Sequence, residues 1–242
     1  LADYTGYQRL GHLSSVALPG GTQAIKQPWR NTFSQLNHYL GWENVIHQWG
    51  DLESVIWLNQ QPLEVLFQMI KGGVNSPMSS SCGRLFDGVA ALLNICREEI
   101  SYEGQAAIEL ESAAQRGQES GSGNYRLHII SDSGLQRLDS HSLWLSMLED
   151  LSNGVPGEEI AWRFHLGLAD GISEMASGLA KEKGVDTIAL SGGVFQNKTL
   201  FELVTTRLNN QGFSVLSHHQ IPSNDGGLSL GQAVIGAANA LT

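Results

Sequence analysis

The stretch Ser191-Gly192-Gly193-Val194-Phe195-Gln196-Asn197 follows directly on the apolar run 186–190 and precedes a segment of helical periodicity, 198–210. This order predicts a buried strand, a glycine-rich turn and a helix. Backbone N–H groups at such a junction point toward whatever occupies the helix N-terminus, and they favour an anion there. The stretch is therefore a candidate nucleotide-binding turn.

A second polar turn, Pro222-Ser223-Asn224-Asp225-Gly226-Gly227, lies between the β-rich segment 213–217 and a small-residue helix at 228–241. The alternation of strand and helix predicts two parallel strands joined by a crossover helix. We expect both turns at the same edge of one sheet, because open α/β folds build their sites at the carboxyl ends of parallel strands.

The first turn has the spacing of neither Gly-x-Gly-x-x-Gly nor Gly-x-x-x-x-Gly-Lys-Ser/Thr, which excludes a dinucleotide fingerprint and a P-loop. Gly192 and Gly193 would let the backbone approach a phosphate or a ribose, and the Asn197 carboxamide both donates and accepts hydrogen bonds. The alternative is an ordinary strand-to-helix turn in which Asn197 caps the helix. The pattern leaves both interpretations open.

Five further side chains could have a functional role, and each has an ordinary structural alternative. Asp225 is held on a turn with little steric cover, which suits a cation, although an Asx-turn capping the last helix is the favoured alternative. Asp87 lies in a largely apolar helix and faces either solvent or a ligand. At most one of His218 and His219 could join Asp225, because adjacent strand residues face opposite sides. Cys82 has no base tied to it by spacing, so we expect a buried thiol rather than a nucleophile.

The composition narrows the class of protein. The chain has 242 residues, and 14 basic against 24 acidic residues give a formal charge of −10 without a basic cluster, so nucleic acid is not an expected partner. Its two cysteines suit a reducing compartment, and we expect a cytoplasmic protein. Neither a membrane span nor a leader is indicated, and the start without Met suggests a region of a longer polypeptide.

Four motifs occur in order along the chain, and they are Ser80-Ser81-Cys82-Gly83-Arg84-Leu85-Phe86-Asp87-Gly88-Val89-Ala90, Tyr102-Glu103-Gly104-Gln105-Ala106-Ala107, Leu190-Ser191-Gly192-Gly193-Val194-Phe195-Gln196-Asn197 and Ser223-Asn224-Asp225-Gly226-Gly227-Leu228. With these motifs the chain resembles the C-terminal carbamoyltransferase region of the [NiFe]-hydrogenase maturation proteins HypF over essentially its whole length. More remotely it is similar to TsaD, the tRNA threonylcarbamoyl transferase, and to antibiotic O-carbamoyltransferases.

The resemblance implies an α/β fold of the actin-like/Hsp70-like ATPase (ASKHA) type, TsaD-like, with two lobes around a cleft and the first lobe incomplete. Segment 1–25 would be the end of the first lobe, 26–78 a helical insertion, and 79–242 the nucleotide-binding α/β region of the second lobe.

The resemblance also implies an activity. The family makes carbamoyl adenylate in an upstream domain, and this region would transfer the carbamoyl group to the C-terminal cysteine of HypE, releasing AMP on the route to the cyanide ligands of the hydrogenase iron. The expected cofactors are an adenine nucleotide (carbamoyl adenylate, ATP or AMP) and a divalent metal, which could be zinc, iron or magnesium. The expected partners are HypE and the upstream domains of the same polypeptide.

Matching the motifs residue by residue assigns Asp87 and Gly104 to the ribose side of the adenylate and Asn197, with the turn at Gly192 and Gly193, to the nucleotide. Asp225 would be a metal ligand. The family's metal site also uses a His-x-x-x-His pair, which occurs nowhere in these 242 residues. We therefore expect the chain alone to be inactive.

Two other functions stay open. A small-molecule kinase of the same architecture would use the glycine turn for ATP phosphates, but it would need a catalytic base and an early phosphate loop that the sequence does not contain. A non-catalytic interaction domain would use exposed tryptophans, such as Trp42 and Trp49, and the Gly/Ser-rich loop 115–124.

Overall fold

A computed structural model describes residues 1–118, 123–132 and 134–240 of the chain. The chain separates into two compact units. The first comprises Leu1–His12, Ile129–Leu138 and Ala169–Thr242, and the second comprises Leu13–His128 and Asp139–Leu168. Each unit is considered by itself. The three predicted segments 1–25, 26–78 and 79–242 follow sequence order, whereas the units interleave along the chain, so the assignment to lobes stays a prediction.

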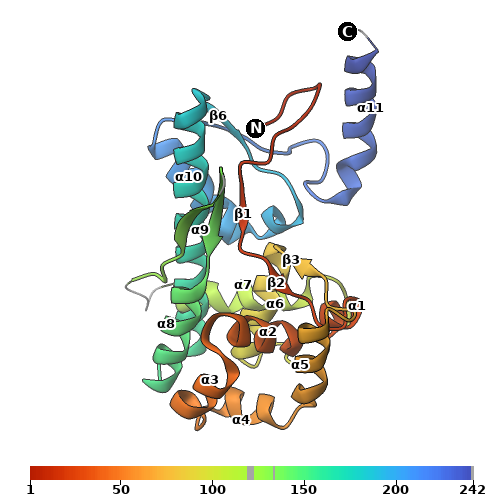
Figure 1. The fold of residues 1–242 in the computed structure, drawn as a ribbon. Coiled ribbons are helices and arrows are strands. Elements are labelled where there is room, and N and C mark those ends of the chain that lie inside the picture. The colour runs from red at the N-terminus through yellow and green to blue at the C-terminus, as the bar shows by residue number, and fades with distance from the viewer. Residues whose placement is uncertain (119–122, 133, 241–242) are drawn as a thin grey trace. The chain divides into compact units, whose positions relative to one another are not determined.

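The second unit is mostly helical (Figure 1). It contains the antiparallel pair of short strands β2 (Val16–Ala17) and β3 (Met78–Ser79). Its helices are α1 (Thr22–Lys26), α2 (Trp29–Leu40), α3 (Trp42–Trp49), α4 (Glu53–Asn59), α5 (Leu63–Gly72), α6 (Cys82–Leu92), α7 (Gln105–Gly117) and α8 (His141–Ser152), with the N-terminal part of α9 (Gly157–Lys183). The helices expected between Pro28 and Lys71 are thus present as α2 to α5.

Helix α6 lies at the centre of the core of the second unit. It packs on α2 and α7, and all its residues from Leu85 to Leu92 are buried. The Phe86 ring meets the Phe164 ring edge-on at a centroid distance of 5.0 Å. The Thr32 hydroxyl donates to the Gly88 carbonyl at 2.8 Å, which joins α2 to α6. Ser81 is the N-cap residue of this helix, and its side chain makes no capping hydrogen bond.

The first unit contains two sheets and the helices that flank them. One sheet has the strand order β1 (Gly11–Leu13), β5 (Leu135–Asp139) and β4 (His128–Asp132). The other consists of β6 (Thr187–Ala189) and β7 (Ser214–Leu216). The remaining elements are the C-terminal part of α9, α10 (Lys198–Asn210), α11 (Leu228–Asn239) and the short 3-10 helices η1 (Gly193–Gln196) and η2 (Asp225–Gly227).

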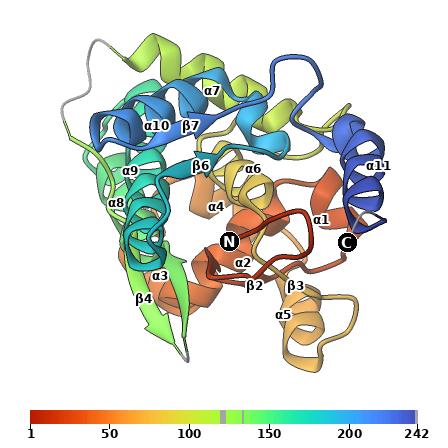
Figure 2. The ribbon, with the colours of Figure 1, turned by 90° about the horizontal axis from the view of Figure 1, so that it is seen from above.

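The predicted β-α-β-α unit at the C-terminal end of the sequence is confirmed. β6 and β7 pair in parallel, Ile188 opposite Val215, and α10 connects them (Figure 2). The prediction that the first of these strands is buried is wrong, because Thr187 and Ala189 are exposed. The sheet has two strands among the described residues.

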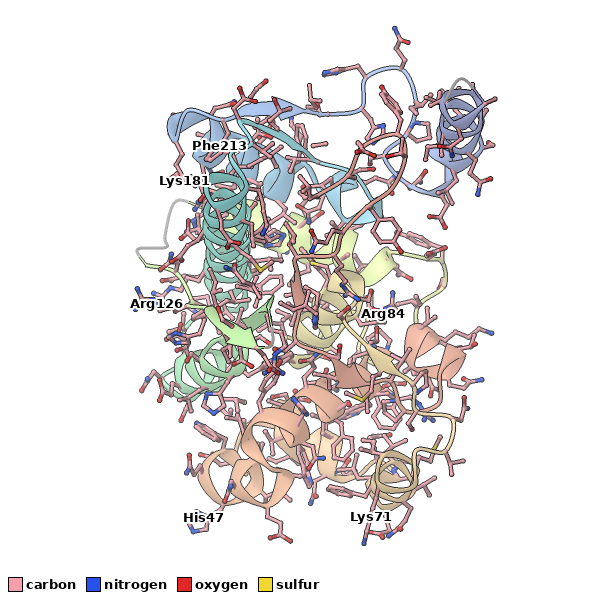
Figure 3. All side chains as sticks on the ribbon, turned by 45° about the horizontal axis from the view of Figure 1, so that its top comes forward. His47, Lys71, Arg84, Arg126, Lys181 and Phe213 are labelled. Carbon is pink, nitrogen blue, oxygen red and sulfur yellow. The ribbon has the colours of Figure 1, made fainter. Side chains whose placement is uncertain are left out.

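Polar and cation–π contacts tie the C-terminal part of α9 to this unit. Arg207 of α10 forms an ion pair with Asp170 of α9. The Lys181 ammonium lies 5.9 Å from the centre of the Phe213 ring, and both side chains are marked in Figure 3. Helix α9 therefore holds the β6–α10–β7 segment by its side chains.

Helix α11 has no buried residue. Leu228, Leu230, Val234 and Ile235 are each between 44% and 58% exposed. Figures 1 and 2 both show α11 standing apart from α10 and β6 of the same unit. The helix is at the predicted place, but its apolar side chains stay largely exposed within the described residues.

Candidate functional site

The two polar turns of the first unit meet directly. The Gly192 N–H donates to the Ser223 carbonyl at 2.8 Å, and a Cβ placed on Gly193 would lie 3.9 Å from the Asn224 Cβ. Both turns follow the parallel strands β6 and β7, so the prediction of a shared sheet edge is confirmed.

The geometry corrects one part of the prediction for the first turn. Gly192 adopts φ 102° and ψ 157°, a conformation that only glycine takes readily. Its N–H is engaged by Ser223 and is not free for an anion, contrary to the expectation of free amides at this junction. Gly192 thus shapes the turn, and Gly193 is the exposed glycine of the pair.

Asn197 is the N-cap of α10. Its side-chain oxygen accepts a hydrogen bond from the Leu200 N–H at 2.8 Å, and the residue is 9% exposed. The ordinary interpretation of this asparagine as a helix cap therefore accounts for its carbonyl oxygen. It leaves the nucleotide role of Asn197 as a prediction.

Asn224 rather than Asp225 makes the Asx-type contact in the second turn. The Gly226 N–H donates to the Asn224 side-chain oxygen at 3.0 Å, and Asn224 is the N-cap of η2. Asp225 is exposed, and within the described part of the chain no hydrogen bond or ion pair of its carboxylate is found. The favoured alternative, a capping role for Asp225, is therefore wrong, and its carboxylate is available to a ligand.

Asp87 belongs to the second unit and is 2% exposed. This decides the question of solvent or interior that the sequence left open. Its carboxylate oxygen Oδ2 lies 2.6 Å from the Arg84 guanidinium, one helical turn earlier on α6. Burial raises the pKa of Asp87 to about 6, and the Arg84 charge opposes that rise.

Gly104 lies at the N-terminus of α7 in the same unit. Its φ of 81° is left-handed, and no atom lies within 4 Å of a Cβ placed there. The glycine is thus required by backbone conformation, and the space beside it is open. Since α6 and α7 pack together, Asp87 and Gly104 are carried by neighbouring helices.

The two cysteines are both free. Burial raises the pKa of Cys82 to about 12. The pKa of Cys96 is also raised to about 12, first by burial and then by Glu109 and Asp87. Both thiols stay protonated near neutral pH, as expected for Cys82, and neither is a nucleophile in this state.

The histidines next to the second turn pair with serines. His218 Nε2 lies 2.9 Å from the Ser191 hydroxyl, and His219 Nε2 lies 3.2 Å from the Ser217 hydroxyl. His218 thus adds a second link between the two turn regions. Sequence reasoning treated it as a strand-end residue and missed this contact, because nothing in the spacing relates Ser191 to His218.

The described residues do not form a metal site by themselves. No group of three or more His, Cys, Asp or Glu side chains with suitable geometry occurs among residues 1–118, 123–132 and 134–240. Asp225 offers one carboxylate, and a divalent cation needs more ligands than one. The metal stays a prediction.

The tryptophans proposed as an exposed binding surface are buried. Trp42 is 5% and Trp49 is 7% exposed, and the Trp42 ring packs edge-on against Phe33. The loop proposed with them, 115–124, lies partly outside the described residues, and 115–117 belong to α7. In the described part of the chain, no helix combines the length and the apolar character needed to span a bilayer.

Comparison with known proteins gives the family. Residues 1–232 match a family model described as "Carbamoyltransferase, Kae1-like Domain, second subdomain". A carbamoyltransferase HypF from Rhodobacter capsulatus is 35% identical over an alignment 242 positions long, which covers 98% of this chain and 29% of that protein. The tRNA N6-adenosine threonylcarbamoyltransferase of Prochlorococcus marinus is 27% identical over 206 residues, covering 74% of this chain and 55% of that protein.

A solved structure supports the same conclusion for the fold. Full-length HypF in a phosphate- and nucleotide-bound form superposes with a TM-score of 0.85 at 32% identity, covering 98% of this chain and 30% of that one. The predicted α/β fold of the ASKHA, TsaD-like type is confirmed by these matches. The chain spans about 30% of the length of its HypF relatives. By sequence and by fold, the chain belongs to the HypF carbamoyltransferase family, in which it corresponds to the second subdomain of the Kae1-like domain.

Proposed function

We propose that this chain takes part in carbamoyl transfer from carbamoyl adenylate to the C-terminal cysteine of a HypE partner, in the maturation of [NiFe] hydrogenases. The observation that carries the proposal is the match of residues 1–232 to the carbamoyltransferase subdomain. A nucleotide and phosphate are bound in the solved HypF relative, which supports the choice of a nucleotide-linked substrate.

The proposed reaction needs little from the protein beyond positioning. The acceptor thiolate attacks the carbamoyl carbon, a carbon–sulfur bond forms, and the bond from that carbon to the phosphate oxygen breaks to release AMP. The proton of the acceptor thiol passes to solvent. Because the mixed anhydride is already activated, the protein would contribute orientation and stabilisation of the charge that develops on the leaving phosphate.

The nucleotide side is assigned from the local geometry of the first unit. Gly192 is engaged with Ser223, so we assign the backbone approach to the phosphate to Gly193. Asn197 would donate from its amide nitrogen while its oxygen keeps capping α10. The Asp225 carboxylate is the proposed metal ligand, with zinc, iron or magnesium as the candidate ions.

The ribose side is assigned from the local geometry of the second unit. The Asp87 Oδ2 atom is buried and has no hydrogen-bond partner in the described part of the chain. Unsatisfied buried oxygens are rare, and an ionised carboxylate accepts hydrogen bonds from paired sugar hydroxyls. Gly104 leaves open space at the start of the adjacent helix, where a backbone group can approach the sugar.

The acceptor thiol is assigned to a partner protein. Cys82 and Cys96 both have a pKa near 12 and are held as thiols, so neither supports a covalent carbamoyl intermediate on this chain. We propose HypE as the acceptor and an upstream domain of the same polypeptide as the source of the adenylate, with all three in the cytoplasm.

The test uses a full-length chimera in which this chain replaces the matching segment of the Rhodobacter capsulatus relative. Carbamoyl adenylate and a HypE protein are supplied, and AMP release and the mass gain of one carbamoyl group on the HypE cysteine are followed. We expect transfer by the chimera, none by the chain alone, and loss of transfer in Asp87→Ala and Asp225→Ala. Exposed Asp51→Ala is the matched control.

Asn197 needs a separate variant because it caps a helix. Asn197→Asp keeps an oxygen for the Leu200 N–H, removes the amide donor and adds a negative charge where a phosphate would bind. We expect weaker AMP binding with unchanged thermal stability. A chimera that folds and binds HypE but releases no AMP would exclude the proposed reaction, and phosphorylation of small alcohols would favour the kinase alternative.

A further inference from the structure

Arg84 and Asp87 form a charged pair inside the second unit. Their opposite charges lie close together, but the two facing atoms are not joined by a well-oriented hydrogen bond. Asp87 Oδ2 and Arg84 Nη1 lie 2.6 Å apart, yet neither atom makes a geometrically acceptable hydrogen bond in the described part of the chain. The Oδ2 atom is therefore held close to a cation and lacks a well-oriented hydrogen bond.

The position of the pair on the helix is specific. Arg84 and Asp87 are three residues apart on α6, so they share one helix face. The Asp87 side chain is 2% exposed and the Arg84 side chain 16% exposed. Arg84, which is marked in Figure 3, thus reaches from the surface toward a carboxylate that solvent hardly touches.

Among the described residues that pack near Asp87, no second positive charge stabilises its ionised form. On α2, the groups that meet α6 beside Gly88 come from Asn31 and Thr32, which are neutral. The Phe86 ring packs on His165 of α9, whose burial lowers its pKa to about 4, so it is neutral at pH 7.

The remaining titratable groups near Asp87 are Cys96 and Glu109. Cys96 follows α6 and is protonated, with a pKa near 12, and Glu109 of α7 hydrogen-bonds to that thiol. Arg84 is the one neighbouring group in the described residues that lowers the Asp87 pKa against burial.

We propose that Arg84 is a positioning residue that keeps Asp87 ionised and aimed for the hydroxyls of a nucleotide sugar. This inference rests on the proposed function, since it assumes that Asp87 binds the ribose. Arg84 itself need not touch the nucleotide. It supplies the charge without which a buried carboxyl would be protonated and would lose part of its capacity as an acceptor.

The first experiment needs no ligand. The carboxyl carbon of Asp87 is titrated by NMR in the chain and in Arg84→Gln. The expected midpoint in the unsubstituted chain is about 6. Removing an opposite charge at contact distance moves such a midpoint up by about one to three pH units. An unchanged midpoint in Arg84→Gln would refute the proposal whatever the nucleotide does.

The second experiment measures AMP affinity against pH by calorimetry in the full-length chimera. Binding should strengthen as the pH rises through the Asp87 midpoint, because only the ionised form is competent. In Arg84→Gln the profile should move to higher pH, and AMP affinity at pH 7 should fall at least about twofold, in proportion to the ionised fraction. At high pH the affinity of this variant should return toward that of the unsubstituted protein.

Three variants separate positioning from a general structural role. Arg84→Lys keeps a cation and should restore most of the profile. Asp87→Asn should remove the part of the pH dependence that Asp87 contributes and leave that of the AMP phosphate, whose second pKa is about 6. Arg116→Gln, on α7 of the same unit, removes a guanidinium that is exposed and 3.7 Å from Glu158, and it should change neither midpoint nor affinity.

The outcomes distinguish this inference from the function on which it rests. Complete absence of AMP binding by the chimera refutes the proposed function, and the role of Arg84 falls with it. AMP binding that is normal in Arg84→Gln at every pH refutes the positioning role and leaves the proposed function intact. A profile that moves with the NMR midpoint supports both.

Discussion

Helices α6 and α11 have similar lengths and similar small, apolar side chains, and they occupy opposite environments. α6 has 11 residues, of which Leu85 to Leu92 are all buried. α11 has 12 residues and none is buried. Each accompanies one of the motifs that identify the family, Asp87 within α6 and Asp225 just before α11.

The difference shows that an apolar composition does not by itself bury a helix, because burial requires other elements that pack against it. α6 meets α2 and α7 and has aromatic rings from α9 against Phe86. α11 contacts η2 and little else in its unit. Among the described helices, α11 is therefore one whose apolar side chains stay uncovered.

The largest expected effect of a single substitution lies in α6. Phe86→Ala removes a ring that is 1% exposed and packs on Phe164 and His165. Truncation of such a ring should lower the free energy of unfolding by about 3–5 kcal/mol. Urea denaturation followed by circular dichroism measures it, with exposed Val234→Ala in α11 as the control, expected to be nearly neutral. Equal losses in the two variants would contradict the comparison.

Glycine positions in the two helices give a second contrast. A Cβ on Gly88 would lie 3.2 Å from the Trp144 ring and 3.4 Å from the Thr32 nitrogen, whereas Gly231 of α11 has no atom within 4 Å. Gly88→Val should destabilise the chain by about 1–3 kcal/mol through overpacking. Gly231→Val should be neutral or slightly stabilising, because valine is the better helix former. Thermal unfolding of both variants checks this, and a neutral Gly88→Val would mean that α6 packs more loosely than the distances indicate.

The pH dependence of stability should reveal the buried carboxyl group of Asp87 in α6. The folded-state pKa of Asp87, about 6, lies above its ordinary value of 3.8, so its contribution to stability is full below pH 3.8 and is lost as the pH rises through 6. His165 acts in the opposite direction. Its pKa is lowered from 6.5 to about 4, so its contribution is present above pH 6.5 and lost as the pH falls.

Because the two groups oppose each other, the unsubstituted chain should show a shallow dependence on pH in this window. Asp87→Asn removes one of them, and its stability should fall more steeply on acidification, by up to about 1.4 kcal/mol per pH unit. Denaturation at several pH values between 4 and 6 measures the slope. Asp225→Asn, at an exposed position, is the control. If stability depended on pH no more steeply in Asp87→Asn than in this control, Asp87 would not have the raised pKa of a buried carboxyl group.

The smallest effect on stability is expected on α11. Leu230→Lys combined with Val234→Lys replaces two exposed apolar side chains, and the free energy of unfolding should change by no more than about 0.5 kcal/mol. Binding of a hydrophobic dye and self-association of the chain should both decrease. Gln232→Lys adds charge on the same helix without removing apolar surface. A large loss of stability in the double variant would show that α11 is packed after all.

Some of the candidate site could be predicted from residue order alone. The turns after β6 and β7 meet at one sheet edge, as parallel pairing requires. The engagement of the Gly192 amide with Ser223 could not be foreseen, because it depends on how closely two turns from distant parts of the sequence approach. The sequence also could not tell that Asn224 rather than Asp225 makes the capping contact, since both residue types cap helices.

The sequence by itself determined the family, through motifs of fixed spacing, and the order of strands and helices from residue 155 onward, through hydrophobic periodicity that a short range of residues encodes. Only the tertiary structure decided which apolar elements are covered. It placed Asp87 and the tryptophans Trp42 and Trp49 inside, and it left β6 and α11 open to solvent. The physical reason is that periodicity records which face of an element is apolar, while burial depends on neighbours contributed by residues far away in the chain.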